Sequence, residues 1–175
     1  MILEKELFKK IQRDYFFITG KLNIDSQYYI NQIEKGIKEK NNLNFKTNVV
    51  GGMTDWKFFA QDNNFQKVIV QFLNYLDKSY QVLEGFELDD AWGFKVGFGG
   101  YTKAHTHSKY VISGVVYLNN HDQTLEFDEI GESIKPEPGR FGLFSSFLKH
   151  GCKRNESDIP KYGISFNANY KIFPS

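Results

Sequence analysis

Three histidines and one lysine have the residue types and spacing most suggestive of chemistry in this sequence. His105 and His107 lie one residue apart, His150 follows later, and Lys161 stands eleven positions beyond His150. Side chains at positions i and i+2 of a β-strand point to the same face, so His105 and His107 can present two imidazoles to one ion. A third imidazole from a later strand would complete a facial set of ligands and leave other coordination positions open. Open positions are typical of a catalytic metal site rather than a structural one.

The metal and its ligands have several interpretations at this stage. Neutral imidazole binds iron, zinc, copper and nickel, so three histidines do not choose among these metals. The common non-haem iron pattern has two histidines and one carboxylate, and His107 occupies the position of the carboxylate. Glu126 or Asp128, two nearby acids, would serve if His107 is not a ligand. Cys152, two positions after His150, would instead give a closed zinc site with three histidines and one thiolate.

Other polar residues are candidates for binding an organic co-substrate beside the metal. Lys161 lies about one strand beyond the last histidine, where its ammonium can hold the carboxylate of such a molecule. Arg140 and Arg154 are the competing anchors. Tyr117 and Asn167 come from segments predicted as strands that flank the same cavity, and both side chains end in hydrogen-bonding groups. The alternative interpretation is structural, with these residues serving only to hold the sheets together.

The composition is that of one globular domain over residues 1–175, long enough to bury a sizeable core. The aromatic share of 17%, with 17 Phe and 10 Tyr, favours a strand-rich structure. A formal net charge of +1 gives no general electrostatic drive toward nucleic acid or an acidic membrane. One cysteine excludes an intrachain disulfide, and no apolar run approaches the roughly 20 residues that span a bilayer. We therefore expect a soluble cytoplasmic protein.

The first half of the chain, residues 1–85, is predicted to provide helical support. Asp25 is a suitable N-cap for a helix with Tyr29 and Ile33 on its apolar stripe, and Asn63 or Asn64 for a second, longer helix. Residues 16–18 are predicted to form an edge strand. Residues 41–57 are polar and read as a loop, which either passes over a site or is an ordinary connector.

The second half, residues 86–175, has the pattern of short strands separated by turns. Residues 92–98 alternate, residues 111–118 are nearly continuous in apolar side chains, and residues 124–127 are predicted to return as the second strand of a hairpin. His121, in the turn between them, is expected to be solvated. Further strands are predicted at 141–147 and 162–173. Six to eight antiparallel strands after two helices predict an α+β chain, mainly β. Its core would be a cupin-like jelly roll, a double-stranded β-helix, with the two N-terminal helices packed on it.

Four short blocks of the second half occur in the same order in a known family. They are H-T-H at 105–107, I-S-G-V-V-Y-L at 112–118, P-G-R-F-G-L-F-S-S-F-L-K-H at 138–150 and G-I-S-F-N at 163–167. In order and residue type they resemble the 2-oxoglutarate/Fe(II)-dependent oxygenases, in particular their bacterial and phage branch. That branch has H-x-H, S-G-x-x-Y-L, P-x-G-x-(hydrophobic)-x-F-P-S-x-L-x-H and an ending like R-I-S-I-S-F-N. The resemblance covers roughly residues 90–168.

The resemblance implies a double-stranded β-helix, an Fe(II) centre and 2-oxoglutarate as co-substrate. By matching positions, His105, His107 and His150 would be the metal ligands. Lys161 falls where the family usually has the arginine that pairs with the distal carboxylate of 2-oxoglutarate, and lysine serves this role in some related hydroxylases. The implied activity is that of a dioxygenase that hydroxylates a small molecule or a protein side chain. One departure is Gly163, where the family has a serine that contributes a hydrogen bond to the co-substrate.

Two alternatives belong to other classes. Cupins share the jelly roll, and Gly99 with His105 and His107 resembles the start of their first motif. Their glutamate about four residues after the second histidine is absent, because Val111 and Ile112 occupy that place. A three-histidine cupin metalloenzyme that does not use 2-oxoglutarate is one alternative, and a non-enzymatic jelly-roll binding module is the other. The sequence is compatible with a monomer or a homodimer.

Overall fold

The fold consists of two facing antiparallel β-sheets with two helices on one side. The computed structural model describes residues 14–39, 48–80 and 85–171. In chain order the elements are β1 (Phe17–Lys21), α1 (Ser26–Glu39), β2 (Val49–Val50), β3 (Gly52–Met53), α2 (Asn63–Tyr80), β4 (Phe86–Val96), β5 (Tyr101–His105), β6 (Ile112–Tyr117), β7 (Leu125–Phe127), β8 (Glu132–Ile134), β9 (Arg140–Ser145), β10 (His150–Cys152) and β11 (Lys161–Tyr170).

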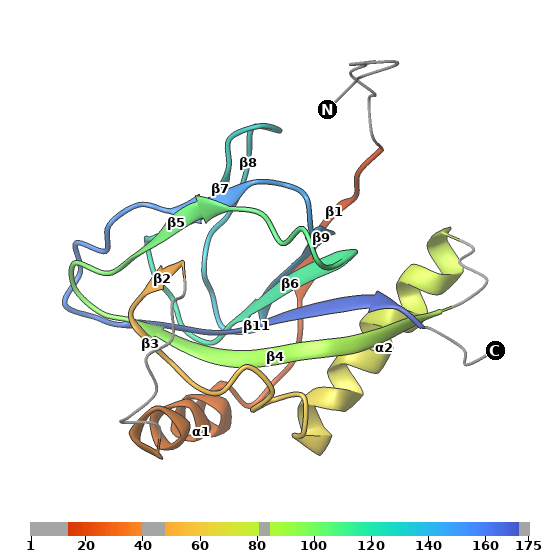
Figure 1. The fold of residues 1–175 in the computed structure, drawn as a ribbon. Helices are drawn as coiled ribbons and strands as arrows, with labels where there is room; N and C mark the ends of the chain where they lie inside the picture. Colours follow the sequence, from red (N-terminus) through yellow and green to blue (C-terminus); the bar gives the residue numbers. More distant parts are fainter. Residues whose placement is uncertain (1–13, 40–47, 81–84, 172–175) are drawn as a thin grey trace, which may run out of the picture.

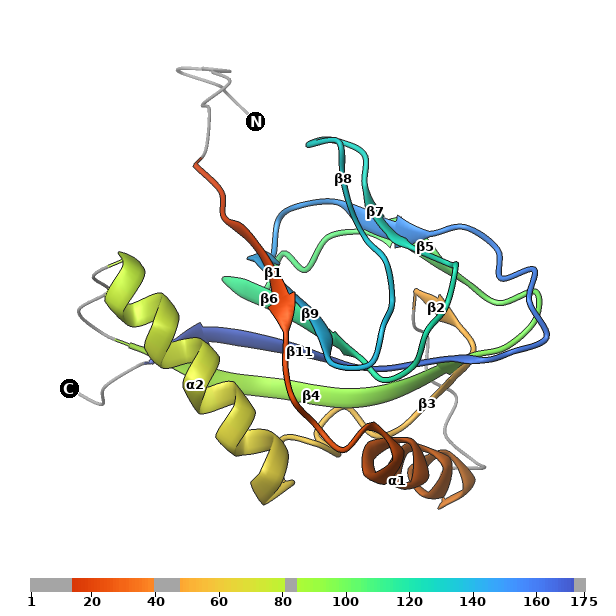
Figure 2. The same cartoon turned by 180° about the vertical axis from the view of Figure 1, so that it is seen from behind.

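The chain passes repeatedly between the two sheets. The larger sheet has the strand order β1-β9-β6-β11-β4-β3, and the smaller has the order β2-β5-β10-β7-β8. From β4 onward, β4, β6, β9 and β11 belong to the larger sheet and β5, β7, β8 and β10 to the smaller one. Both helices cover the outer face of the larger sheet, as the two opposite views show (Figures 1 and 2). A mainly β chain with antiparallel sheets and two helices packed on one of them is therefore confirmed.

The two helices begin where side-chain carboxylates cap them. The Asp25 carboxylate accepts a hydrogen bond from the backbone N–H of Tyr28 at 3.0 Å, as predicted for an N-cap. For α2 the predicted caps, Asn63 and Asn64, were wrong. The Asp62 carboxylate accepts the bond from the Phe65 N–H at 2.7 Å, so the cap lies one residue earlier. An ionised carboxylate at this position also interacts favourably with the positive end of the helix dipole.

The larger of two apolar cores among the described residues lies between the helices and the larger sheet. Ile33 of α1 and Phe65 of α2 are fully or almost fully buried there, against Ile164 and Phe166 of β11. The Phe65 and Phe166 rings meet edge to face, with their centroids 6.2 Å apart. Burial of each such side chain contributes about 1.5–3 kcal/mol relative to exposure, which fixes the larger sheet as a rigid platform.

The predicted hairpin between residues 111–118 and 124–127 was wrong. β6 pairs with β9 and β11 in the larger sheet, whereas β7 pairs with β8 and β10 in the smaller one. The turn-like residues between β6 and β7 therefore carry the chain from one sheet to the other. All six residues of β6 are buried, which is the pattern of a central strand with both faces covered.

The segment predicted as a loop at 41–57 contains short strands. Residues 40–47 lie outside the described residues, but Val49 pairs with Thr102 of β5, and Met53 pairs with Phe94 of β4. β1 pairs with β9 at the edge of the larger sheet, so the edge strand predicted near residue 17 is confirmed. The N-terminal half thus adds strands to both sheets in addition to helices. Among the described residues, no helix is both long and apolar enough to cross a membrane.

Candidate metal centre

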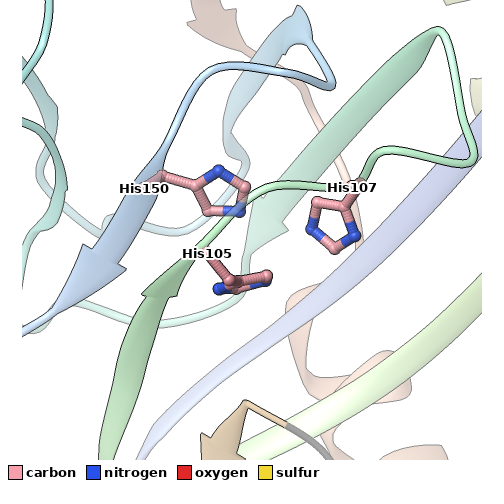
Figure 3. A group of neighbouring side chains, drawn as sticks. All are labelled: His105, His107 and His150. Atoms are coloured by element: carbon pink, nitrogen blue, oxygen red, sulfur yellow. The ribbon is translucent and has the colours of Figure 1, made fainter. Parts of the chain in front are cut away.

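The structure brings His105, His107 and His150 together at one point between the sheets (Figure 3). One ring nitrogen from each residue lies within 4.8 Å of the others. The ring centroids are 4.7 Å apart for His105 and His107, 4.6 Å for His105 and His150, and 5.1 Å for His107 and His150. Among the described residues this is the group of His, Cys, Asp or Glu side chains close enough to share one metal ion.

Three different backbone constraints position these rings. His105 ends β5, and its register partner in the smaller sheet is His150 at the start of β10. His107 does not lie on the strand as predicted, because β5 ends at His105. The chain turns there, and the His107 N–H donates to the Ser146 carbonyl at 2.8 Å. His107 therefore approaches from a loop anchored to the segment after β9, and the three imidazoles converge from three directions (Figure 3).

Two of the imidazoles are oriented by backbone carbonyls. His105 Nδ1 lies 2.7 Å from the Lys103 carbonyl, and His150 Nδ1 lies 2.8 Å from the Leu148 carbonyl. A carbonyl only accepts, so each Nδ1 carries the proton and donates. In the neutral ring the lone pair is then on Nε2, which is the usual arrangement of a metal-binding histidine and its carbonyl partner.

The electrostatic environment keeps these imidazoles neutral. Burial, together with the smaller effect of the neighbouring histidines, lowers the pKa of His107 to about 4 and that of His150 to about 3. Burial also lowers the pKa of His105, against the raising effect of its bond to the Lys103 carbonyl. A neutral imidazole keeps the lone pair that a metal requires. Phe127 and Phe144 pack against the His150 ring, with centroids 5.4 and 4.8 Å away, and exclude water from that side.

A cavity of about 60 Å³ is lined by the three histidines and by residues of both sheets. By this measure one water molecule needs roughly 10–15 Å³, so the cavity has room for several waters or a small organic molecule. Its walls combine apolar side chains, including Trp92, Phe94 and Leu125, with a few polar ones. Val49, from the segment predicted as a possible cover, also lines it.

Lys161 lies in this cavity and is 1% exposed. Its ammonium donates to the Gln123 carbonyl at 3.2 Å and to Cys152 Sγ at 3.3 Å. No carboxylate among the described residues comes within ion-pair distance of it. Burial lowers the pKa of Lys161, and the nearby Cys152 opposes that shift. A buried cation without a counterion is costly, and an anionic ligand in the cavity would remove that cost.

Tyr117 and Asn167 line the same cavity, and both are almost completely buried. Burial raises the pKa of the Tyr117 hydroxyl well above the usual range, so the hydroxyl stays protonated and can donate a hydrogen bond. The Lys161 ammonium lies 5.8 Å from the centre of the Tyr117 ring. The Asn167 carbonyl oxygen accepts from the Ser113 hydroxyl at 2.7 Å. The predicted neighbourhood of Lys161, Tyr117 and Asn167 is therefore present.

The competing candidates lie elsewhere. The Glu126 carboxylate is 3.3 Å from the Lys153 ammonium and does not line the cavity, and Asp128 is exposed. Arg140 pairs with Glu137 at 3.0 Å, and Arg154 is exposed with its guanidinium over the Tyr101 ring. Cys152 lines the cavity but contacts Lys161, and it does not belong to the three-histidine group. The alternatives based on these acids, arginines and the thiolate do not fit the geometry.

The prediction that His121 is solvated was wrong. It is 7% exposed, its Nδ1 accepts from the Gln123 N–H at 2.9 Å, and its Nε2 lies 2.9 Å from the Ile159 carbonyl. Sequence reasoning also missed Gln123, because it is the backbone carbonyl of this residue that contacts Lys161. A backbone contact leaves no signal in residue type.

The glycine at position 163 has a packing reason. A Cβ atom there would lie 2.4 Å from Phe94 Cζ and 3.0 Å from the Val116 carbonyl oxygen. Phe94 in turn lines the cavity. A serine at this position is therefore excluded unless the Phe94 ring moves. The Phe94 ring occupies the space that the serine of the oxygenase pattern described above would need.

The fold is similar to that of several solved enzymes, although the sequence matches no protein-family model and no curated protein. Viral collagen prolyl hydroxylase from Paramecium bursaria Chlorella virus-1, in its 2-oxoglutarate complex, has a TM-score of 0.67 at 17% identity, over 88% of this chain and 94% of that chain. The prolyl-4-hydroxylase of Pseudomonas putida has a TM-score of 0.69 at 14% identity, over 89% and 93%.

A third similar structure has a different activity. It is SnoN, described as a non-haem α-ketoglutarate-dependent epimerase of nogalamycin biosynthesis. Its complex with Fe³⁺, α-ketoglutarate and nogalamycin RO has a TM-score of 0.65 at 10% identity, over 90% of this chain and 81% of that chain. Sequence identities this low establish a shared fold only. The predicted resemblance to 2-oxoglutarate/Fe(II) oxygenases is therefore confirmed for the fold.

Proposed function

We propose that this protein is a 2-oxoglutarate- and Fe(II)-dependent dioxygenase, most simply a hydroxylase. The single observation that carries the proposal is the shared cavity. Three neutral imidazoles and the buried Lys161 ammonium, which has no carboxylate partner among the described residues, line this cavity together. One group of side chains suits a metal, the other suits an anion, and a small 2-oxo diacid satisfies both.

His105, His107 and His150 would hold the metal through their unprotonated ring nitrogens. The donor set fits iron, since imidazole is a good ligand for it and a three-ligand facial set leaves positions for a chelating co-substrate and dioxygen. Bound Fe(II) would supply the activation of dioxygen, by which 2-oxoglutarate yields succinate and carbon dioxide while one oxygen atom enters a C–H bond of the substrate. The three neutral ligands leave the centre more positively charged than the common set with one carboxylate.

Lys161 and Tyr117 would hold the distal carboxylate of the co-substrate. The ammonium supplies the charge and the phenol supplies a second donor, and both are almost fully buried. In a cavity shielded from water such charge-assisted hydrogen bonds are roughly twice as strong as neutral ones. Asn167 would offer its amide N–H groups to the same ligand, because its carbonyl oxygen already accepts from the Ser113 hydroxyl.

Strands β4 to β11 would form a double-stranded β-helix, the predicted jelly roll. The alternation of these strands between two facing sheets supports this, as does the fold likeness. The substrate would be a small molecule or a protein side chain. Among structures of this fold, one is a prolyl hydroxylase from Trichoplax adhaerens in complex with a peptide fragment of hypoxia-inducible factor, and SnoN is in complex with nogalamycin RO.

Turnover of 2-oxoglutarate tests the proposal without knowledge of the substrate. Protein loaded with Fe(II) and supplied with dioxygen should form succinate slowly by uncoupled reaction, detected by mass spectrometry. His107→Ala should lower succinate formation by more than about 100-fold, since loss of a ligand exceeds the roughly 10–100-fold effect of losing a ligand's outer partner. Equal succinate formation by the wild type and His107→Ala would remove His107 from the mechanism.

Elemental analysis separates the enzyme from a non-enzymatic binding module. An oxygenase should bind Fe(II) reversibly and respond to 2-oxoglutarate. A binding module should hold tightly bound zinc, or no metal, and show no response. Stoichiometric zinc that resists a chelator and no succinate after Fe(II) loading would contradict the oxygenase proposal.

A further inference from the structure

The Lys161 ammonium is fixed by the protein at two points. It has three N–H groups, of which one donates to the Gln123 carbonyl at 3.2 Å and one to Cys152 Sγ at 3.3 Å. One N–H remains, and the ammonium lies 5.8 Å from the centre of the Tyr117 ring. The two contacts therefore decide where the remaining N–H and the positive charge point within the cavity.

The Gln123 carbonyl is held in place by a buried network. The Gln123 side-chain amide donates to the carbonyls of Gly100 at 3.1 Å and Lys153 at 2.5 Å. Its backbone N–H donates to His121 Nδ1. Because an N–H only donates, Nδ1 carries no proton, so Nε2 carries it and donates to the Ile159 carbonyl at 2.9 Å. The His121 ring thus joins two segments and sets the position of the peptide whose carbonyl meets Lys161.

Cys152 connects the same lysine to the metal centre. It lies two residues after His150 on β10, a strand of only three residues, and it is 8% exposed. The register of β10 against β5 shifts between these two residues, from His150 opposite His105 to Cys152 opposite Thr102. One short, irregular strand therefore carries both a candidate metal ligand and an acceptor for the ammonium.

We propose that His121 and Cys152 are positioning residues for the co-substrate. With the Gln123 carbonyl they form the Lys161 support, which holds the ammonium where its remaining N–H meets a distal carboxylate. This inference rests on the proposed function. Pre-organisation of a binding group lowers the cost of ordering it when the ligand arrives, so loss of either residue should weaken the carboxylate contact alone.

Two ligands separate this role from a general structural one. 2-Oxoglutarate has the distal carboxylate, and pyruvate is a 2-oxo acid without it. We expect Cys152→Ala and His121→Phe to raise the Kd of 2-oxoglutarate roughly tenfold, the effect of one hydrogen bond to a charged group. The Kd of pyruvate should stay within about twofold, since only the shared metal-binding end is involved. Calorimetry on the Fe(II)-loaded protein without oxygen measures both constants.

Conservative variants provide the controls. Cys152→Ser keeps an acceptor near the ammonium and should recover part of the affinity that Cys152→Ala loses. His121→Phe keeps a planar ring and removes both nitrogens, and Cys152→Ala and Cys152→Ser carry the test if that variant fails to fold. Lys161→Met gives the upper limit of the effect, because it removes the charge itself.

The same measurements distinguish a failure of the Lys161 support from a failure of the proposed function. A metal-loaded wild type that binds neither acid would overturn the proposed function. A wild type that binds 2-oxoglutarate, with Cys152→Ala and His121→Phe binding it equally well, would overturn the Lys161 support. Equal weakening of both acids in the variants would also overturn it, because the residues would then act on the fold in general.

Discussion

The two faces of β11 are built for opposite purposes. Tyr162, Ile164, Phe166 and Ala168 belong to the large apolar core that the helices cover, and Phe166 also borders the cavity. Lys161, Ser165 and Asn167 alternate with them and line the cavity. Alternate residues of this one strand therefore contribute to the apolar core and to the candidate site.

The difference separates stability from binding. The helix face gains free energy from burial of apolar surface, and its side chains need no ligand. The cavity face buries an ammonium that has no carboxylate partner among the described residues, which lowers stability unless a ligand completes the site. We expect substitutions on one face to change the free energy of unfolding, and substitutions on the cavity side to change ligand affinity.

The largest effect on the cavity side should come from removing a metal ligand. His150→Ala should raise the Kd of Fe(II) by more than about 100-fold, because two remaining imidazoles and water replace three convergent ligands. His121→Phe is the matched control, since it removes a buried histidine outside the group and should leave the Fe(II) affinity unchanged. Anaerobic metal titration measures both, and unchanged affinity in His150→Ala would contradict the site.

Lys161→Met sharpens the comparison by moving two quantities in opposite directions. Loss of the buried ammonium should weaken 2-oxoglutarate binding by about 2–5 kcal/mol of binding free energy, which is seen as a higher Kd. The free energy of unfolding without ligand should increase by about 1–3 kcal/mol, because an apolar side chain replaces an unpaired buried charge. Lys153→Met, on the exposed surface, should change neither quantity appreciably. A destabilised Lys161→Met protein would show that the ammonium serves the fold.

On the helix face, Ile164→Ala should act on stability alone. Ile164 is 0% exposed, so truncation should cost about 2–5 kcal/mol of unfolding free energy. Ile159→Ala, at a position that is 63% exposed, should cost less than about 0.5 kcal/mol. Urea denaturation measures both, and calorimetry should give an unchanged Kd for 2-oxoglutarate in folded Ile164→Ala. A selective loss of 2-oxoglutarate binding there would break the separation of the faces.

The smallest effect should appear as a pH dependence of the metal-free protein. The pKa values of His107 and His150 are lowered to about 4 and about 3, below the ordinary value of 6.5. At a pH between the lowered pKa values and 6.5, these histidines are protonated in the unfolded chain and neutral in the folded one. The free energy of unfolding is therefore highest above pH 6.5 and falls as the pH falls. Each of the two histidines should contribute a loss of about 2 kcal/mol in unfolding free energy between pH 7 and 5, and His107→Gln should remove its own share of that loss. If the unfolding free energy of the wild type and of His107→Gln changed equally with pH, His107 would not be buried as described.

Sequence reasoning located the elements better than it located their partners. The apolar stripes around Ile33 and Phe65 predicted both helices, because helical periodicity is a local signal. The hairpin of β6 and β7 failed, since a turn-like sequence does not reveal whether the next strand stays in the same sheet. Strand pairing depends on long-range packing, which local residue types do not encode.

The candidate site divides in the same way. His105, His107, His150 and Lys161 were identifiable from residue type and spacing, and the structure brings them to one cavity. The contact of Lys161 with the Gln123 carbonyl was not identifiable, because every residue has a carbonyl. The burial of His121 also escaped prediction, since its polar neighbours in sequence differ from its neighbours in space.

An anaerobic absorption titration tests the central claim most directly. Fe(II)-loaded wild type should develop a weak visible band when 2-oxoglutarate is added without oxygen, and Lys161→Met should need a much higher concentration to reach the same absorbance. His107→Ala should give no band. A wild type that binds Fe(II) but shows no band at any 2-oxoglutarate concentration, or a Lys161→Met variant that titrates like the wild type, would contradict the account.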